Sequence, residues 1–438
     1  MQNVIRRCAL TLFLAVCSLC AIGQDKPKKL DSIDADRIHA MLKTAYAELK
    51  SNYYDKTFHG IDMEARLKEY DAKVSTVGSL GEGFRIVAAY LSVLKDSHVF
   101  FLPPARAVRM DNGYKMQMIG DACIVTQVKP QTEVAEKLHP GDRILKLNGF
   151  TVGRQDLWDI EYYFNVLAPS PSQKLSVRDV QGVARDFTLN ATVKQLKRSL
   201  DTENRTDMLD LTLGREDSED LFTDRVLETP EVMYWKMSQF QASDLVVQGI
   251  YGRAAKHPAL VIDLRGNPGG AIDTLQWALG GLFDHDVKIS DRVGRKEMKP
   301  QVAKASRTPY KGKVIVLIDS GSASSSELFA RVVQLEKRGT VLGDVSAGAV
   351  MEARRYEDNI GSGSMIFYGF EITDANLIMK DGKSIEGVGV TPDEISLPTR
   401  QEVADGVDPV LARAAELAGG KLTPADAGKM FPFVWRKL

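Results

Sequence analysis

Short apolar runs alternate with segments of helical periodicity through the second half of the chain, and this alternation constrains the fold more than any other feature. The apolar runs lie at 232–237, 259–264, 314–318 and 341–342, and the helical segments at 242–257, 271–283 and 327–337. Strands that alternate with helices of about ten to fifteen residues imply crossover connections, and therefore a mainly parallel sheet. We expect an α/β domain over residues 226–438.

Three different patterns precede this domain. Residues 24–105 have apolar positions at three- and four-residue spacing, which predicts a small helical N-terminal domain. Residues 106–194 change to strand-like runs, with a Pro-Gly-Asp turn at 140–142 and an Asn-Gly hairpin signal at 148–149, and predict a β-rich domain. Residues 195–225 are charged and weakly periodic, so we expect a linker or a long loop. The chain as a whole is then a multidomain α+β protein.

The first 23 residues have the pattern of a secretory signal peptide. Arg6 and Arg7 precede an apolar run at 8–22, and small residues stand at Ala21 and Gly23 before the expected cut. A membrane anchor is the alternative, but the run is shorter than the roughly twenty residues that span a bilayer. The pattern therefore predicts export to a periplasm or secretion, with no stable membrane insertion after cleavage.

Composition excludes several classes of protein. Cys8, Cys17 and Cys20 lie in the predicted signal peptide, so only Cys123 remains, and a disulfide framework is excluded. Neither Cys17 nor Cys20 follows a small residue, which leaves a lipoprotein as the lesser alternative. We expect Cys123 to be a buried thiol in a core strand. The chain has 57 Lys+Arg against 58 Asp+Glu, or 55 against 58 without the signal peptide, and lacks the basic surplus of a nucleic-acid binder.

Two loops that follow apolar strands and open helices are candidate sites, because open α/β sheets bind ligands at the carboxyl ends of their strands. The first reads Asp-Leu-Arg-Gly-Asn-Pro-Gly-Gly at 263–270. Its glycines let the backbone approach a ligand, and the N–H groups of the next helix can stabilise an anion or an oxyanion. A phosphate loop is the competing interpretation, but the Gly-Lys-Ser/Thr ending that holds phosphate is missing.

The second loop, at 319–327, has five serines among nine residues. Helix capping is one explanation, since Ser324 and Glu327 have the spacing of a capping box. A nucleophile is the other, because a strand-to-helix turn can present one hydroxyl with N–H groups behind it. Spacing alone favours the cap.

The order of the motifs along the chain resembles the tail-specific, or C-terminal-processing, serine protease family. Leu-Lys-Asp-Ser-His at 94–98 comes first, then the β-rich insert, the two loops, and Ile-Glu-Gly-Val-Gly-Val-Thr-Pro-Asp at 385–393. The resemblance implies a crotonase-like core in the α/β catalytic domain. The β-rich insert, with its Pro-Gly-Asp turn, resembles a PDZ domain of bacterial proteases, and another small β-rich domain is the alternative.

The family resemblance implies a role for each part of the two loops. Ser324 would be the nucleophile, and backbone N–H groups of Gly269, Gly270 and Ser325 would form the oxyanion hole. The implied reaction is hydrolysis of a polypeptide through an acyl-enzyme, without a cofactor. No Cys/His spacing suggests a zinc site, so we expect no metal.

The sequence departs from the processing proteases at the general base. Their lysine stands about twenty-five residues after the serine, where this chain has Ala349, which cannot accept a proton. The tricorn-like branch uses a Ser-His pair and a glutamate instead, and Ser97, His98 and Glu386 match them. The resemblance implies that His98 is the base and that Ser97 and Glu386 orient it. A histidine suits the task because its ordinary pKa is about 6.5; a structural histidine at a helix end is the alternative.

The PDZ resemblance implies a second peptide site around Gly113, Tyr114 and Lys115, where a peptide would add as a strand and its carboxylate would meet backbone N–H groups. The single glycine leaves carboxylate capture open, and packing or gating is the alternative. Two other functions also stay open. One is a catalytically inactive peptide-binding scaffold, and the other is a Ser-Lys protease with a displaced lysine, for which Lys337 and Lys380 are nearest in sequence.

Overall fold

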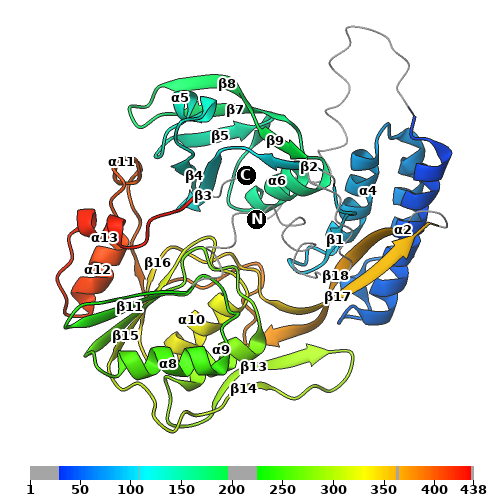
Figure 1. The fold of residues 1–438 in the computed structure, drawn as a ribbon. Coiled ribbons are helices and arrows are strands. Elements are labelled where there is room, and N and C mark those ends of the chain that lie inside the picture. Colours follow the sequence, from blue (N-terminus) through cyan, green and yellow to red (C-terminus); the bar gives the residue numbers. More distant parts are fainter. Residues whose placement is uncertain (1–28, 107, 196–223, 362–364, 436–438) are drawn as a thin grey trace, which may run out of the picture.

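The computed structural model describes residues 29–106, 108–195, 224–361 and 365–435, which form a helical part, a β-rich part and an α/β part (Figure 1). The predicted signal peptide and nearly all of the predicted linker at 195–225 lie outside the described residues. Within those residues, no helix combines the length and the apolar character that a bilayer crossing requires.

The helical part is held together by three capped helices. They are α2 (Ser32–Asn52), α3 (Met63–Lys73) and α4 (Leu80–Ser92), with short 3₁₀ turns at Phe58–Gly60 and Val74–Thr76. The N-cap side chains of Asp31, Asp62 and Ser79 each accept a backbone N–H three residues on, as capping residues do. The apolar faces of α2 and α4 form one core with residues of strand β18, so this part is packed onto the rest of the chain.

The β-rich part is an antiparallel sheet in the order β3-β4-β5-β7-β8, with β6 paired to β5. Its strands are β3 (Tyr114–Ile119), β4 (Ala122–Val128), β5 (Arg143–Leu147), β6 (Phe150–Thr151), β7 (Ser172–Arg178) and β8 (Ala184–Asn190). Its helices are α5 (Glu133–Lys137) and α6 (Leu157–Glu161), which continues as a π-helix at Tyr162–Leu167, and β2 (Val108–Asp111) pairs with β9 (Thr192–Gln195). Strand β3 is an edge strand of this sheet. Cys123 is a buried free thiol in β4, as predicted.

The α/β part contains the predicted parallel sheet, in the order β10-β11-β12-β15-β16-β19. The strands are β10 (Arg225–Glu228), β11 (Val232–Lys236), β12 (Ala259–Asp263), β15 (Lys313–Ile318), β16 (Thr340–Gly343) and β19 (Glu394–Ile395). Only the β10–β11 pair is antiparallel. Strand β10 begins at the end of the predicted linker, which is therefore not loop throughout.

Helices cover both faces of the parallel sheet. Leu260 and Ile262 belong to a core with α8 (Asp244–Ala254), α9 (Ile272–Gly280) and α10 (Ser325–Leu335). Val261 belongs to a second core with α12 (Pro409–Leu417), and α13 (Pro424–Met430) packs beside it; α11 (Arg400–Ala404) lies between β19 and α12 in the chain. Alternate residues of each central strand thus face opposite helical layers, which is why these strands are apolar throughout.

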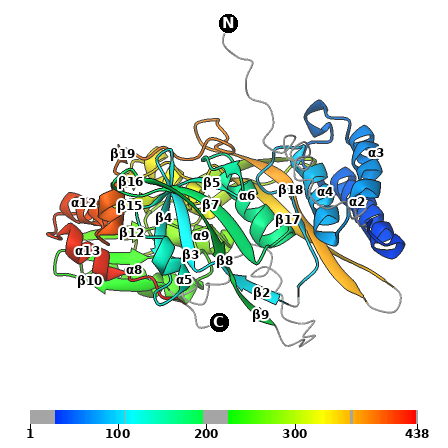
Figure 2. The same cartoon turned by 90° about the horizontal axis from the view of Figure 1, so that it is seen from above.

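A second sheet joins the helical part to the α/β part. Its order is β1 (Phe100–Leu102), β18 (Ile366–Ile378), β13 (Val287–Gly294) and β14 (Gln301–Ala303), and β17 (Met351–Ile360) pairs with β18 as a long hairpin. Figure 2 shows β17 and β18 running alongside α2 and α4. Because β1 pairs with β18 from Phe100 onward, the stretch that carries His98 is held next to the α/β part.

Candidate active site

Ser324 stands at the sharp turn between β15 and helix α10. Its backbone has φ 55° and ψ −118°, in the positive-φ region that costs a residue with a Cβ roughly 1–3 kcal/mol. The backbone N–H of Ser324 holds the turn in place, because it donates to the Ala349 carbonyl at 2.9 Å and to the Glu327 carboxylate at 3.0 Å. A strained strand-to-helix turn of this kind presents a serine hydroxyl outward with N–H groups behind it.

Glu327 holds this turn against the following loop. Its carboxylate is fully buried and accepts from Ser346 Oγ at 2.6 Å and from the N–H groups of Gly348 at 2.7 Å, Ala349 at 2.9 Å and Ser324 at 3.0 Å. Burial raises the pKa of Glu327 to about 7, although the four donors favour its charged form. The sequence suggested only a capping role for this residue. Its contacts with the 346–349 loop depend on a fold that capping-box spacing does not reveal.

The loop at 263–270 approaches Ser324 closely enough to require glycine. Gly269 has φ +99°, and a Cβ there would lie 2.7 Å from Ser324 Cβ and 3.0 Å from the Ser325 nitrogen. Gly270 has φ +141°, and a Cβ there would overlap the carbonyl oxygen of Phe240. The Ser325 hydroxyl donates to the Gly270 carbonyl at 3.0 Å. The structure therefore brings the three predicted oxyanion-hole residues together around Ser324.

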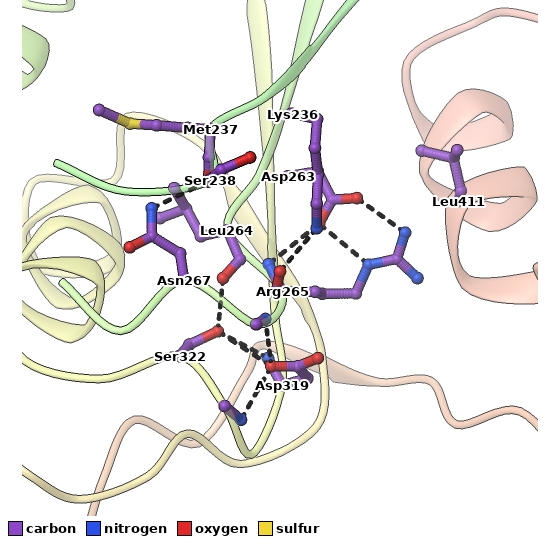
Figure 3. A network of polar contacts seen from close by, with 12 residues as sticks. Lys236, Met237, Ser238, Asp263, Leu264, Arg265, Asn267, Asp319, Ser322 and Leu411 are labelled. Carbon is purple, nitrogen blue, oxygen red and sulfur yellow. Dashed lines mark hydrogen bonds and ion pairs between the residues drawn. The ribbon is translucent and has the colours of Figure 1, made fainter. Parts of the chain in front are cut away.

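An ion network fixes the start of the same loop (Figure 3). Asp263 is buried and receives Arg265 Nη2 at 2.8 Å and Lys236 Nζ at 3.2 Å. Arg265 also pairs with Asp408 at 2.7 Å, across to the N-cap of helix α12. Although burial acts to raise it, the charges of Arg265 and Lys236 hold the pKa of Asp263 well below its usual range. The loop is thus tied to both β11 and α12.

Further hydrogen bonds join the two loops to each other. Asp319 Oδ1 accepts the N–H of Gly266 at 2.8 Å, and the Ser322 hydroxyl donates to the Leu264 carbonyl at 2.8 Å (Figure 3). The side-chain oxygen of Asn267 accepts the N–H of Gly269 at 2.8 Å. Together these bonds set the position of Gly269 relative to the serine turn.

His98 is linked to Glu386 through a hydroxyl. Ser97 Oγ lies 2.8 Å from His98 Nδ1 and 2.9 Å from Glu386 Oε2, and the Ser97 N–H donates to Glu386 Oε1 at 2.9 Å. The ionised carboxylate can only accept, so the single Ser97 proton goes to Glu386 and His98 Nδ1–H donates to Ser97. This assignment leaves His98 Nε2 as a proton acceptor. Burial lowers the pKa of His98 to about 4 and raises that of Glu386.

The turn that carries Ser324 and the carboxylate of Glu386 both form hydrogen bonds with the backbone of residues 349–350. The Ala349 carbonyl accepts the Ser324 N–H, and the adjacent Val350 N–H donates to Glu386 Oε2 at 2.7 Å. Among the described residues, no hydrogen bond joins the His98 ring to the Ser324 hydroxyl. The four predicted catalytic residues are therefore linked through one backbone segment, without a hydrogen bond between the histidine ring and the serine hydroxyl in the described part of the chain.

Sequence reasoning missed Asp96, which fixes the backbone at the histidine. Its Oδ1 accepts the His98 N–H at 2.9 Å and the Thr373 hydroxyl of β18 at 2.7 Å, and burial raises its pKa. Tyr54 of the helical part also reaches this point, because its N–H donates to the Thr373 carbonyl at 2.9 Å. The Asp-x-His spacing is the one local signal for this turn, since a carboxylate can accept an N–H two residues on.

The predicted peptide-binding residues lie at the start of edge strand β3. The Gly113 N–H donates to Asp111 at 2.8 Å, and the buried Tyr114 donates its hydroxyl to Gln173 at 2.7 Å, so that side chain packs inward. Lys115 follows within β3. The other end of β3 touches the serine loop, where Gln117 donates to Asp319 at 2.5 Å. This strand thus extends from Gly113 to the loop that precedes Ser324.

Lys337 and Lys380, the two lysines nearest in sequence to Ala349, are exposed. Lys380 pairs with Glu336 at 2.8 Å, and Lys337 lies at the end of helix α10. Neither donates to Ser324. Lys236 is engaged by the Arg265 carbonyl at 2.6 Å and by Asp263.

Comparisons with known proteins agree with the motif order. Residues 231–396 match the model of peptidase family S41, and residues 34–91 match the model of the Tricorn protease C1 domain. A carboxy-terminal-processing protease of Bartonella bacilliformis is 33% identical over 164 residues, which are 36% of this chain and 35% of that protein. The carboxy-terminal processing protease CtpA of Bacillus subtilis is 23% identical over 406 residues, covering 88% of this chain and 73% of that protein.

The matched regions of the first curated relatives cover only 29% to 39% of those proteins' lengths. The solved structure of mature CPAF complexed with lactacystin is 15% identical, has a TM-score of 0.63, and covers 85% of this chain and 96% of its own, which shows a shared fold. The two models thus match peptidase family S41 over residues 231–396 and the Tricorn protease C1 domain over residues 34–91, in the same chain that shares the fold of this solved structure.

Proposed function

We propose that the protein is an exported serine endopeptidase that hydrolyses unfolded or C-terminally exposed polypeptides through an acyl-enzyme on Ser324. The observation that carries this proposal is the Ser324 turn, with φ 55°, packed against Gly269 and joined through residues 349–350 to Glu386. Export rests on the sequence of the first 23 residues alone. The reaction needs no cofactor.

In the proposed reaction Ser324 is the nucleophile, His98 transfers the proton, and backbone N–H groups stabilise the oxyanion. His98 Nε2 takes the proton of the Ser324 hydroxyl as its oxygen attacks the scissile carbonyl carbon, and N–H groups of Gly269, Gly270 and Ser325 stabilise the oxyanion. His98 then gives the proton to the leaving amine, and water hydrolyses the ester by the same steps. The hydrogen bond between the His98 ring and the Ser324 hydroxyl would form when substrate closes the site. In many enzymes this bond is long in the substrate-free state and shortens only after substrate binds.

Ser97 and Glu386 would act by positioning the base. The link from Glu386 through the Ser97 hydroxyl fixes the tautomer of His98 and stabilises the imidazolium that forms after proton transfer. The buried Glu327 carboxylate would hold the nucleophile turn in its strained conformation.

The β-rich part would act as a PDZ-like domain that receives the substrate. Strand β3 is an edge strand that begins at Gly113, and its backbone could pair with a peptide, with Lys115 near the start. Tyr114 would support this strand from the core. The contact of Gln117 with Asp319 would connect the bound peptide strand to the serine loop.

The test is hydrolysis of unfolded casein by the Ser324→Ala variant. We expect no cleavage above background, with an unchanged thermal unfolding curve. Ser320→Ala is the matched control, because it removes a hydroxyl of the same loop that donates to the Met118 carbonyl, and it should keep activity. Full activity in Ser324→Ala would overturn the proposal.

A peptide-binding scaffold without catalysis is the second candidate. The absence of a hydrogen bond between Ser324 and His98 among the described residues, and Ala349 in place of the family's lysine, favour it. Reaction with a fluorophosphonate separates the two functions, since only an activated serine forms the covalent adduct. Folded protein that forms no adduct on Ser324 would favour the scaffold.

A further inference from the structure

A cavity of about 720 Å³ lies between the β-rich part and the loops of the parallel sheet. Residues 114–117 of edge strand β3 line it, together with Pro268 of the 263–270 loop and Gly321 of the 319–327 loop. Residues 431–434, which follow helix α13, also line it. Figure 1 shows the chain after α13 running from the α/β part toward β3 and β4.

The segment 431–435 is fixed at both ends. At its start, the Arg225 guanidinium lies 5.5 Å from the centre of the Phe431 ring and donates to the Pro432 carbonyl at 2.9 Å. At its end, the Trp435 ring lies 5.8 Å from Lys129 Nζ in the β-rich part. The segment therefore spans from the parallel sheet to the β-rich part in a defined path.

Between these ends, two apolar side chains lie half-exposed at the cavity. Phe433 is 39% exposed and Val434 is 53% exposed, and both line the cavity. Because the cavity stays open beside them, the segment forms a wall and does not fill the space. Apolar surface left exposed at such a position is stabilised when a ligand covers it with apolar surface of its own.

We infer that residues 431–435 form a wall of the substrate groove, and that Phe433 and Val434 are specificity-determining residues that select extended polypeptides with apolar side chains. This inference rests on the proposed function, because the same groove would bring the polypeptide to Ser324. Strand β3 supplies backbone pairing that is independent of sequence, whereas the wall supplies the preference for apolar residues.

The test measures peptide binding to a Ser324→Ala protein, so that no peptide is cut. A fluorescent unstructured peptide rich in Leu and Phe is compared with a matched peptide that carries Ser and Asn at those positions. Phe433→Ser should weaken the apolar peptide about fivefold and leave the polar one unchanged. Val434→Ser should act in the same direction, and Phe433→Leu should restore most of the binding.

Phe367→Ser is the matched control, because Phe367 is 46% exposed and is not among the residues that line the cavity. Equal binding of the apolar peptide to Phe433→Ser and its parent would overturn the inference. Tighter binding of the apolar peptide to Phe433→Ser would also overturn it, because the segment would then occupy the groove. A loss of binding in Phe367→Ser equal to that in Phe433→Ser would overturn it as well. If these differences hold while protein with Ser324 intact cuts no polypeptide, the proposed function fails and the groove assignment stands.

Discussion

Ser97 and Glu386, 289 positions apart in the chain, are joined by two hydrogen bonds of 2.9 Å, from the Ser97 N–H and from its hydroxyl. Because the same hydroxyl contacts His98 Nδ1, the Glu386 carboxylate determines which ring nitrogen of His98 is free to accept a proton. The pair thus joins the turn between helix α4 and strand β1 to the 385–393 motif of the α/β part.

Replacement of Glu386 should impair the chemical step more than substrate binding. Glu386→Ala leaves the Ser97 hydroxyl without its acceptor, so His98 loses its fixed tautomer, and kcat should fall on the order of 100-fold with little change in KM. Glu386→Gln keeps one acceptor oxygen and should lose less. Steady-state kinetics on an internally quenched peptide check this, and a change confined to KM would contradict it.

The pH dependence should reflect the lowered pKa of His98. Burial lowers its pKa from 6.5 to about 4, so the neutral, proton-accepting form persists well below neutral pH. The acid limb of kcat/KM should therefore fall near pH 4. An acid limb near 6.5 would show that the ring is solvated in the working enzyme.

The same pKa shift should appear in folding stability. In the unfolded chain His98 binds a proton below pH 6.5, whereas the folded state resists protonation down to about 4. Protonation thus favours the unfolded state, so the free energy of unfolding decreases as pH falls from about 6.5 to about 4. His98→Gln should show a shallower acid dependence in denaturant unfolding than the parent, and equal slopes would contradict this account.

Gly269 and Gly266 form a matched pair in one loop. Gly269→Ala would place a Cβ 2.7 Å from Ser324 Cβ, so the nucleophile turn must shift, and kcat should fall on the order of 100-fold. Gly266 has φ +70° but open space around its Cβ position, so Gly266→Ala should cost about 1 kcal/mol of stability and keep most activity. Similar kinetics in the two variants would argue against Gly269 as part of the oxyanion hole.

Glu327 should prove important for stability as well as for activity. Glu327→Ala leaves the N–H groups of Gly348 and Ala349 and the Ser346 hydroxyl without their acceptor in a buried site, so the free energy of unfolding should fall by at least about 3 kcal/mol. Denaturant titrations give this number. A loss below about 1 kcal/mol would mean that water or other groups replace the carboxylate.

The parallel sheet could be predicted because its central strands β11, β12, β15 and β16 are mainly buried, which leaves apolar runs in the sequence. The β17–β18 hairpin could not. Strand β17 is rich in charged residues and is stabilised by pairing along β18, which also packs on the helical part. Its pattern gives no apolar alternation that a sequence window would detect.

In the candidate site, too, the sequence indicates some residues and misses others. The order of motifs points to Ser324, Gly269 and Glu386 as candidates, and their roles stay predictions. Asp96 could not be predicted, since its partner Thr373 lies 277 positions away, and neither could the contact of Glu327 with the 346–349 loop. Such contacts depend on tertiary packing, which local spacing does not encode.

The rate of fluorophosphonate labelling tests the central claim most directly, because it needs no knowledge of the substrate. Intact-mass and peptide mapping should place a single adduct on Ser324 of the parent. The His98→Ala variant should react on the order of 100-fold more slowly, while Lys380→Ala should react at the parental rate. An adduct that forms equally fast in His98→Ala would contradict the assignment of His98 as the base that activates Ser324.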